Sequence, residues 1–285
     1  MGPAMSNGFP QDAPSSSTPR VTSTGAGLRR LAYFGLSIIL VSAVCSWAVH
    51  PLVPLPWWKI FRRCVSIASA VTLLVFMWRV HGQSLGALGL GPWKRGKAQL
   101  IQGLVIGFWS VFILLSLNLA IGACRLTTTA GTWELIGTLL AFLPAAALVS
   151  VLEELIFRGY ILQQLLACSR VVAVIASSAV FALVHMRLKE FWLHSLFELT
   201  GLFLLGGVLA LSTLRTKQLY LAIGLHAALA YWVGINKLVV EFPYPSLQWV
   251  VGTSRVANGM IPWLVLLWIG WVVARGNAPT PKAVG

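Results

Sequence analysis

The chain has 285 residues, of which 58% are hydrophobic and 10% are charged, and its mean hydropathy is +0.82. A soluble domain carries roughly 25% charged residues, so this composition excludes a soluble globular protein and indicates an integral membrane protein. The formal charge of +14 does not indicate a nucleic-acid partner, because the basic residues lie between apolar runs, as in loops at lipid headgroups.

Residues 1–27 are rich in Ser, Thr, Pro and Gly, which predicts a disordered tail. Residues 31–275 are predicted to form one all-α polytopic bundle, and 276–285 a short C-terminal tail. A helix needs about 20 apolar residues to cross a bilayer. About eight transmembrane helices are therefore predicted, at 31–49, 64–81, 99–121, 135–156, 171–186, 194–213, 219–236 and 259–274.

The fourth run is ambiguous, because the apolar stretch from Trp133 to Cys168 is too long for one span and Pro144 interrupts it. A helix that begins near Pro144 would put Glu153 well inside the membrane. A helix that ends near Ile156 would put it nearer a surface. The sequence leaves both arrangements open.

The distribution of Lys and Arg predicts the orientation. With the N-terminus inside, 13 of the 21 basic residues fall in inner segments and 8 in outer ones. Both termini are therefore expected in the cytosol, and the short loops favour a bacterial cytoplasmic membrane.

Carboxylates are scarce in this chain, and few of them lie within apolar runs. The acidic residues are Asp12, Glu134, Glu153, Glu154, Glu190, Glu198 and Glu241. Only Glu153, Glu154 and Glu198 fall inside predicted spans. Burying a charge in a bilayer costs at least about 2.5 kcal/mol on insertion scales, so such residues indicate a functional site.

The segment "VLEELIFRGY", residues 151–160, holds two of these glutamates and an arginine. Glu154 and Arg158 are four residues apart on one helical face and are predicted to form an ion pair. Glu153 points about 100° away from Glu154 and can face a cavity, where a carboxylate suits a general base. The alternative is a charged helix end that reaches the headgroups.

Two histidines favour the catalytic interpretation. His185 ends "VFALVH", and His226 lies within "LAIGLHAAL". His50, His81 and His194 lie at span edges, where interfacial histidines are common. A glutamate and a histidine can polarise a water, and a second histidine can donate to an oxyanion. Glu198 follows His194 by four residues, so a His–Glu pair is expected there, with a supporting or substrate contact as the alternative.

Several hydrolytic mechanisms are excluded by missing or misplaced motifs. The chain has no H-E-x-x-H zinc motif. Its G-x-S-x-G match, residues 82–86, lies between two predicted helices and not on the strand-to-helix turn that a nucleophilic serine of this kind requires. Its only aspartate is Asp12, so a pair of membrane aspartates is impossible. What remains is a water activated by Glu and His, with or without a metal.

Three blocks in order resemble the CPBP family of intramembrane proteases, which includes the type II CAAX prenyl endopeptidases. They are "EELIFRG", "FALVH" and "FLLGGVLALSTLRTKQLYLAIGLHA", and the resemblance extends over residues 145–236. It implies an intramembrane endopeptidase of the glutamic type that cuts a membrane-associated, prenylated or apolar substrate.

By that resemblance, Glu153 would activate water together with His185, Glu154 and Arg158 would support it, and His226 would stabilise the oxyanion. The family usually has an Asn four residues after this histidine, and here the position is Ala230. Asn236 is not an obvious replacement. Losing one oxyanion donor can lower a rate about 100- to 1,000-fold.

No cofactor is expected, and zinc bound by one Glu and two His is the less favoured alternative. The expected partners are a lipidated or membrane-embedded peptide and the bilayer itself. Two other functions remain open: a proton-coupled transporter that uses the same Glu and His residues, and a non-catalytic immunity or scaffolding membrane protein.

Overall fold

The computed structural model describes residues 24–275 except 129, 187–191, 254 and 256, and the side chains of 192–195 are outside this description. The described part is almost entirely helical. Its main helices are α1 (Thr24–Val49), α2 (Trp57–Val75), α3 (Trp93–Ala120), α4 (Thr132–Glu154), α6 (Arg170–Val184), α7 (Trp192–Thr216), α8 (Tyr220–Val239) and α10 (Met260–Arg275).

Short elements join these helices. Two of them are π-helical turns, η2 (Phe76–Val80) after α2 and η4 (Leu155–Ile161) after α4. The others are η1 (His50–Leu52), η3 (Leu85–Leu88), α5 (Leu162–Leu165), η5 (Pro245–Leu247), α9 (Gln248–Val251), and the strands β1 (Arg125–Leu126) and β2 (Val240–Glu241).

The predicted all-α membrane architecture is confirmed, whereas the number of about eight spans is not. Each predicted run contains a helix, but in the described residues only six are long and apolar enough to cross a membrane. These are Thr24–Leu52, Trp57–Val80, Trp93–Ala120, Thr132–Leu165, Leu196–Thr216 and Tyr220–Val239. Helices α6 and α10 have 15 and 16 residues, fewer than the ~20 that a span needs.

Two boundaries differ from the sequence-based expectation. Helix α1 begins at Thr24, so the last four residues of the predicted tail 1–27 are helical. Residues 1–23 and 276–285 lie outside the described residues. The run Thr132–Leu165 is one helical stretch of 34 residues, and Pro144 does not end it. A transmembrane helix tolerates a proline because neighbouring groups satisfy the freed carbonyl.

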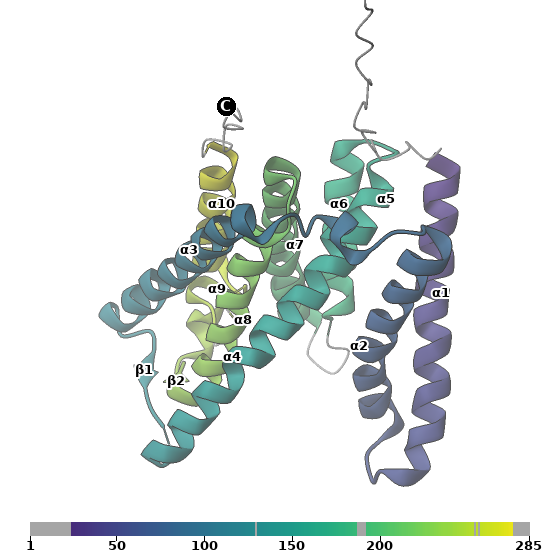
Figure 1. The fold of residues 1–285 in the computed structure, drawn as a ribbon. Helices are drawn as coiled ribbons and strands as arrows, with labels where there is room; N and C mark the ends of the chain where they lie inside the picture. Colours follow the sequence, from purple (N-terminus) through teal and green to yellow (C-terminus); the bar gives the residue numbers. More distant parts are fainter. Residues whose placement is uncertain (1–23, 129, 187–191, 254, 256, 276–285) are drawn as a thin grey trace, which may run out of the picture.

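Helices α3 and α8 pack closely because small residues line their contact (Figure 1). A Cβ on Gly103 would lie 2.3 Å from the Leu221 carbonyl oxygen, and one on Gly224 would lie 2.2 Å from the Leu100 carbonyl oxygen. Gly103 and Gly107 form a G-x-x-x-G pattern, which lets membrane helices approach backbone to backbone. This contact positions α8, which carries His226.

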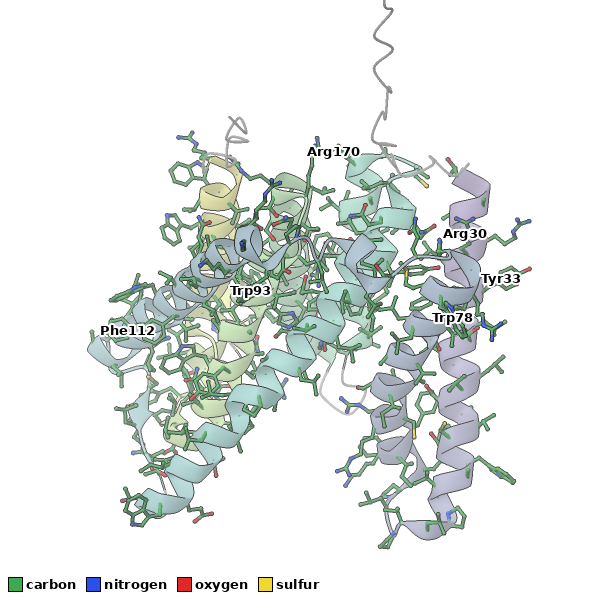
Figure 2. All side chains as sticks on the ribbon, viewed as in Figure 1. Arg30, Tyr33, Trp78, Trp93, Phe112 and Arg170 are labelled. Carbon is green, nitrogen blue, oxygen red and sulfur yellow. The ribbon has the colours of Figure 1, made fainter. Side chains whose placement is uncertain are left out.

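The remaining helices pack against one another. Helix α6 packs on α7, α7 on α10, and α4 on α8. In Figure 1, α1 and α2 form a separate pair that meets the other helices at α5 and η4. Many large apolar side chains point outward, as Figure 2 shows for Tyr33, Trp78, Trp93 and Phe112. Such a surface is suited to lipid contact.

The two short strands join the α3–α4 loop to the segment after α8. Arg125 pairs with Glu241 in the sheet register, and their side chains form an ion pair at 2.9 Å. The hydrogen bond from Arg125 lowers the pKa of the exposed Glu241 carboxyl below its usual value. The pair therefore ties two loops together outside the spans.

Candidate functional site

The charged motif lies where α4 changes into the π-helical turn η4. Glu153 and Glu154 end α4, and Arg158 lies within η4. The side chains of Glu154 and Arg158 are 0% and 1% exposed, whereas that of Glu153 is 22% exposed. Single π-helical turns within α-helices are frequent at functional sites. The two glutamates thus differ in environment, one enclosed and the other accessible.

Glu154 and Arg158 form the predicted ion pair. Arg158 Nη1 donates to Glu154 Oε1 at 2.9 Å, and Nη2 donates to the Gly206 carbonyl oxygen of α7 at 3.2 Å. The guanidinium also lies over the ring of Phe181, 4.5 Å from its centroid, which adds a cation–π contact. A buried arginine with these three partners holds η4 against α6 and α7.

Gly206 can offer its carbonyl because it has no side chain. A Cβ at this position would lie 2.9 Å from both Cα and Cβ of Ser178 on α6. At the neighbouring Gly207 the nearest such atom is Ser178 Oγ at 3.9 Å, an ordinary contact. The close approach of α6 and α7 at Gly206 therefore brings the carbonyl within reach of Arg158.

Each histidine is oriented through its Nδ1 atom. His185 Nδ1 lies 2.8 Å from the Phe181 carbonyl oxygen, which can only accept, so Nδ1 carries the hydrogen. His226 Nδ1 lies 2.8 Å from Glu154 Oε1. In both rings Nε2 is then the atom left to face the site. The Phe181 ring contacts both imidazoles, at centroid distances of 4.6 and 5.9 Å.

The two Nε2 atoms converge on Glu153. Glu153 Oε2 lies 3.5 Å from His185 Nε2 and 3.8 Å from His226 Nε2. Oε2 is buried and has no hydrogen-bond partner among the described residues. A water oxygen at hydrogen-bonding distance from these three atoms would satisfy the carboxylate. The structure thus brings Glu153, Glu154, Arg158, His185 and His226 together from three segments of the chain.

The remaining candidate residues lie away from this cluster. Glu198 forms an ion pair with Arg255, and the side chain of its expected partner His194 is outside the described residues. Asn236 is buried beside a small cavity of about 10 Å³ that Asn118 and Thr253 also line. Ala230 lies one helical turn after His226 on α8. No described contact brings Asn236 to the position that Ala230 occupies.

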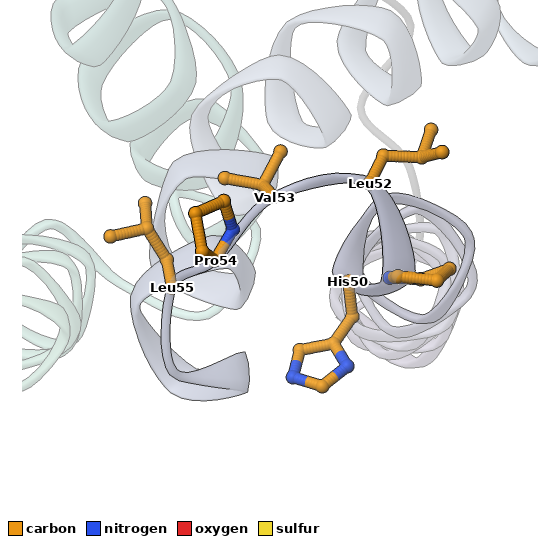
Figure 3. Close-up of a pocket in the computed structure, with 6 residues that line it drawn as sticks. His50, Leu52, Val53, Pro54 and Leu55 are labelled. Carbon is orange, nitrogen blue, oxygen red and sulfur yellow. The ribbon is translucent and has the colours of Figure 1, made fainter.

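A larger hollow of about 350 Å³ is not a candidate catalytic site. It lies at the turn between α1 and α2, where Figure 3 shows its six lining residues, His50–Leu55. His50 is the only one with a polar side chain. Within the described ranges, no three His, Cys, Asp or Glu residues form a group that could hold a metal ion.

The fold and the site define a polytopic membrane protein with a buried Glu–His–Arg cluster. Residues 135–232 match the family model of the type II CAAX prenyl endopeptidases, Rce1-like. The match spans α4 to α8 and includes all five clustered residues, and it confirms the resemblance that the three motifs predict. Searches of the curated proteins and of the solved structures found no match. The family implies a protease acting on a membrane-associated substrate.

The residues that support the cluster through backbone atoms or long-range contacts are not predicted from the sequence. The Gly206 carbonyl and the Glu154–His226 bond both join distant segments. The hydrogen bond from His185 to the Phe181 carbonyl could have been predicted, because the F-x-x-x-H spacing places His185 one helical turn after Phe181. The contact of His81 with Tyr160, 3.3 Å between Nε2 and Oη, gave no sequence signal.

Proposed function

We propose that this chain is an intramembrane endopeptidase of the glutamic type. The observation that supports this proposal most directly is the position of Glu153 Oε2 between His185 Nε2 and His226 Nε2. All three residues lie within the segment that matches a membrane endopeptidase family. Glu153 is the general base, His185 works with it, and Glu154 and Arg158 hold the arrangement. His226 stabilises the oxyanion.

The first step is the activation of water. A water molecule between Glu153 and His185 donates one hydrogen to Oε2 and the other to Nε2, which is an acceptor in the neutral ring because Nδ1–H is bound to Phe181. Glu153 takes a proton as the water oxygen bonds to the scissile carbonyl carbon. The carbonyl π electrons move to oxygen and form the oxyanion. The C–N bond then breaks, and the amine nitrogen receives the proton from Glu153.

The oxyanion needs a donor, and His226 Nε2 is suited to that role. When both ring nitrogens are protonated, Nδ1–H is held by Glu154 and Nε2–H is free to donate. Two ionised glutamates, Arg158 and one imidazolium then sum to zero charge. A neutral cluster is favourable where the surroundings are apolar, because an unbalanced buried charge is strongly destabilising.

The proposed substrate is a peptide held at the membrane by a prenyl group or an apolar C-terminal segment. The family match supports this class. We further propose that the protein lies in a bacterial cytoplasmic membrane with both ends in the cytosol, as the Lys and Arg distribution predicts. Hydrolysis by the Glu/His pair requires no metal.

Reconstitution in liposomes with fluorogenic peptides tests the proposal. The panel contains prenylated, apolar and unmodified peptides of one sequence. We expect the native chain to cleave the prenylated or apolar peptides, Glu153→Ala to cleave none, and chelators to leave the rate unchanged. A rate that a chelator abolishes and zinc restores would contradict the metal-free mechanism. Ion-coupled flux without cleavage, or a cellular function that survives Glu153→Ala and His185→Ala, would contradict the endopeptidase itself.

A further inference from the structure

Tyr160 is buried two residues after Arg158 on η4, and its surroundings come from the α1–α2 pair. It is 1% exposed, and its ring lies 4.6 Å from that of Phe34 on α1 and 6.3 Å from that of Phe76 on η2. Its hydroxyl lies 3.3 Å from His81 Nε2, the one hydrogen-bond partner that the described residues give it. A buried hydroxyl without a partner is unfavourable, so this contact matters to the position of η4.

The contact joins the two π-helical turns that the structure describes. η2 precedes His81 directly, and η4 contains both Arg158 and Tyr160. The α1–α2 pair meets the other helices at α5 and η4 (Figure 1). A shift of Tyr160 would therefore move the same turn that holds Arg158 between Glu154 and the Gly206 carbonyl.

The hydrogen bond can form with either group as the donor. The tyrosine hydroxyl can donate to an unprotonated Nε2, or a protonated Nε2 can donate to the hydroxyl oxygen. Partial burial, and secondly the charge of Arg30 on α1, lower the pKa of His81 below 6.5. Figure 2 shows Arg30 and Trp78 on the α1–α2 pair. At neutral pH the ring is therefore mostly uncharged, which lowers the cost of burying it beside the phenol.

We propose that Tyr160 and His81 form a positioning pair that holds η4, and with it Arg158 and Glu154, in the arrangement that hydrolysis requires. The inference rests on the proposed function and adds a positioning pair to it. The pair lies outside the Glu–His cluster. It acts through the backbone of η4, to which both Arg158 and Tyr160 belong.

The test compares four full-length proteins in liposomes: the native chain, Tyr160→Phe, His81→Gln, and Tyr33→Phe. Tyr33 is 58% exposed on α1 and serves as the matched control. Loss of one hydrogen bond predicts a kcat about 5- to 10-fold lower in Tyr160→Phe, with KM unchanged. The side-chain amide introduced by His81→Gln can still donate or accept the bond. This variant should therefore keep a near-native kcat.

A native kcat in Tyr160→Phe, or a kcat in His81→Gln as low as that of Tyr160→Phe, would overturn the proposal. Thermal unfolding of Tyr160→Phe, His81→Ala and the double variant gives a readout that needs no activity. We expect these two substitutions to be non-additive, and additivity would also overturn the pair. If the native chain cleaves nothing while the coupling is present, the proposed function fails and the coupling of the pair stands.

Discussion

Glu153 and Glu154 are adjacent in the chain, yet the helix turns them toward different partners. The spacing of Glu154 and Arg158 was sufficient to predict their ion pair, because residues four apart share a helical face. The bond from Glu154 to His226 was not predictable, since it spans 72 positions and depends on how α4 packs on α8. Local geometry is readable from one sequence, and contacts between distant segments are not.

Ala230 leads to a prediction at the same scale. An amide at this position, one turn after His226, would add a second donor beside the oxyanion. We expect Ala230→Asn to raise kcat, on the order of 10- to 100-fold, because one oxyanion donor is worth about 100- to 1,000-fold in an optimised site. Steady-state cleavage in liposomes measures the change. Ala230→Leu, similar in volume but without donors, should give no increase, and an equal rise in both variants would contradict the explanation.

At the scale of elements, the π-helical turn η4 is the feature that periodicity failed to reveal. A regular helical period is expected through "EELIFRGY", whereas the structure changes to a π-helix at Leu155. A π-helical turn has weaker backbone hydrogen bonds than an α-helix. The contacts of Arg158 with Glu154 and Gly206 offset this loss. The contact to Gly206 comes from another helix, so no local pattern could predict the turn.

Gly206 tests how closely α6 and α7 must approach. A Cβ there would collide with Ser178 backbone, so Gly206→Ala should push the helices apart and withdraw the carbonyl from Arg158. We expect a loss of about 1–3 kcal/mol in the free energy of unfolding, typical of overpacking, together with a lower cleavage rate. Unfolding in detergent measures the first. Gly207→Ala, which has room for a methyl group, should be close to native, and equal effects at both positions would contradict the steric account.

Alanine substitutions at Gly103 and Gly137 should affect the free energy of unfolding differently. A Cβ on Gly103 would overlap the Leu221 carbonyl of α8, whereas one on Gly137 of α4 meets nothing within 4 Å. Gly103→Ala should lower the free energy of unfolding by about 1–3 kcal/mol. Gly137→Ala should leave it unchanged or raise it by up to about 1 kcal/mol, because alanine favours a helix more than glycine does. A native-like Gly103→Ala would mean that α3 and α8 are not packed through their backbones.

At the scale of the whole molecule, composition was enough to predict an all-α membrane protein, because apolar content and run length follow directly from the bilayer. The number of crossings was not readable, since α6 and α10 are apolar but short. How such helices sit depends on packing and on the surrounding lipid, which the sequence does not contain.

The location of the two ends of the chain tests the proposed topology. Six and eight crossings both leave the two ends on the same side of the membrane, and the Lys and Arg bias predicts that this side is the cytosol. Reporter fusions at each end should both give the cytosolic signal. A reporter inserted in the loop between α1 and α2 should give the opposite signal. Ends on opposite sides would mean that only one of α6 and α10 crosses, and would contradict the proposed topology.

The central claim is that Glu153 activates the water that cuts the peptide. The most direct measurement is kcat/KM of Glu153→Gln on the best peptide of the panel, beside Glu134→Gln, an exposed glutamate at the start of the same helix. General-base catalysis contributes about 100- to 10,000-fold, so Glu153→Gln should lose at least about 100-fold while Glu134→Gln stays native. A folded Glu153→Gln protein that cleaves at the native rate would contradict the account.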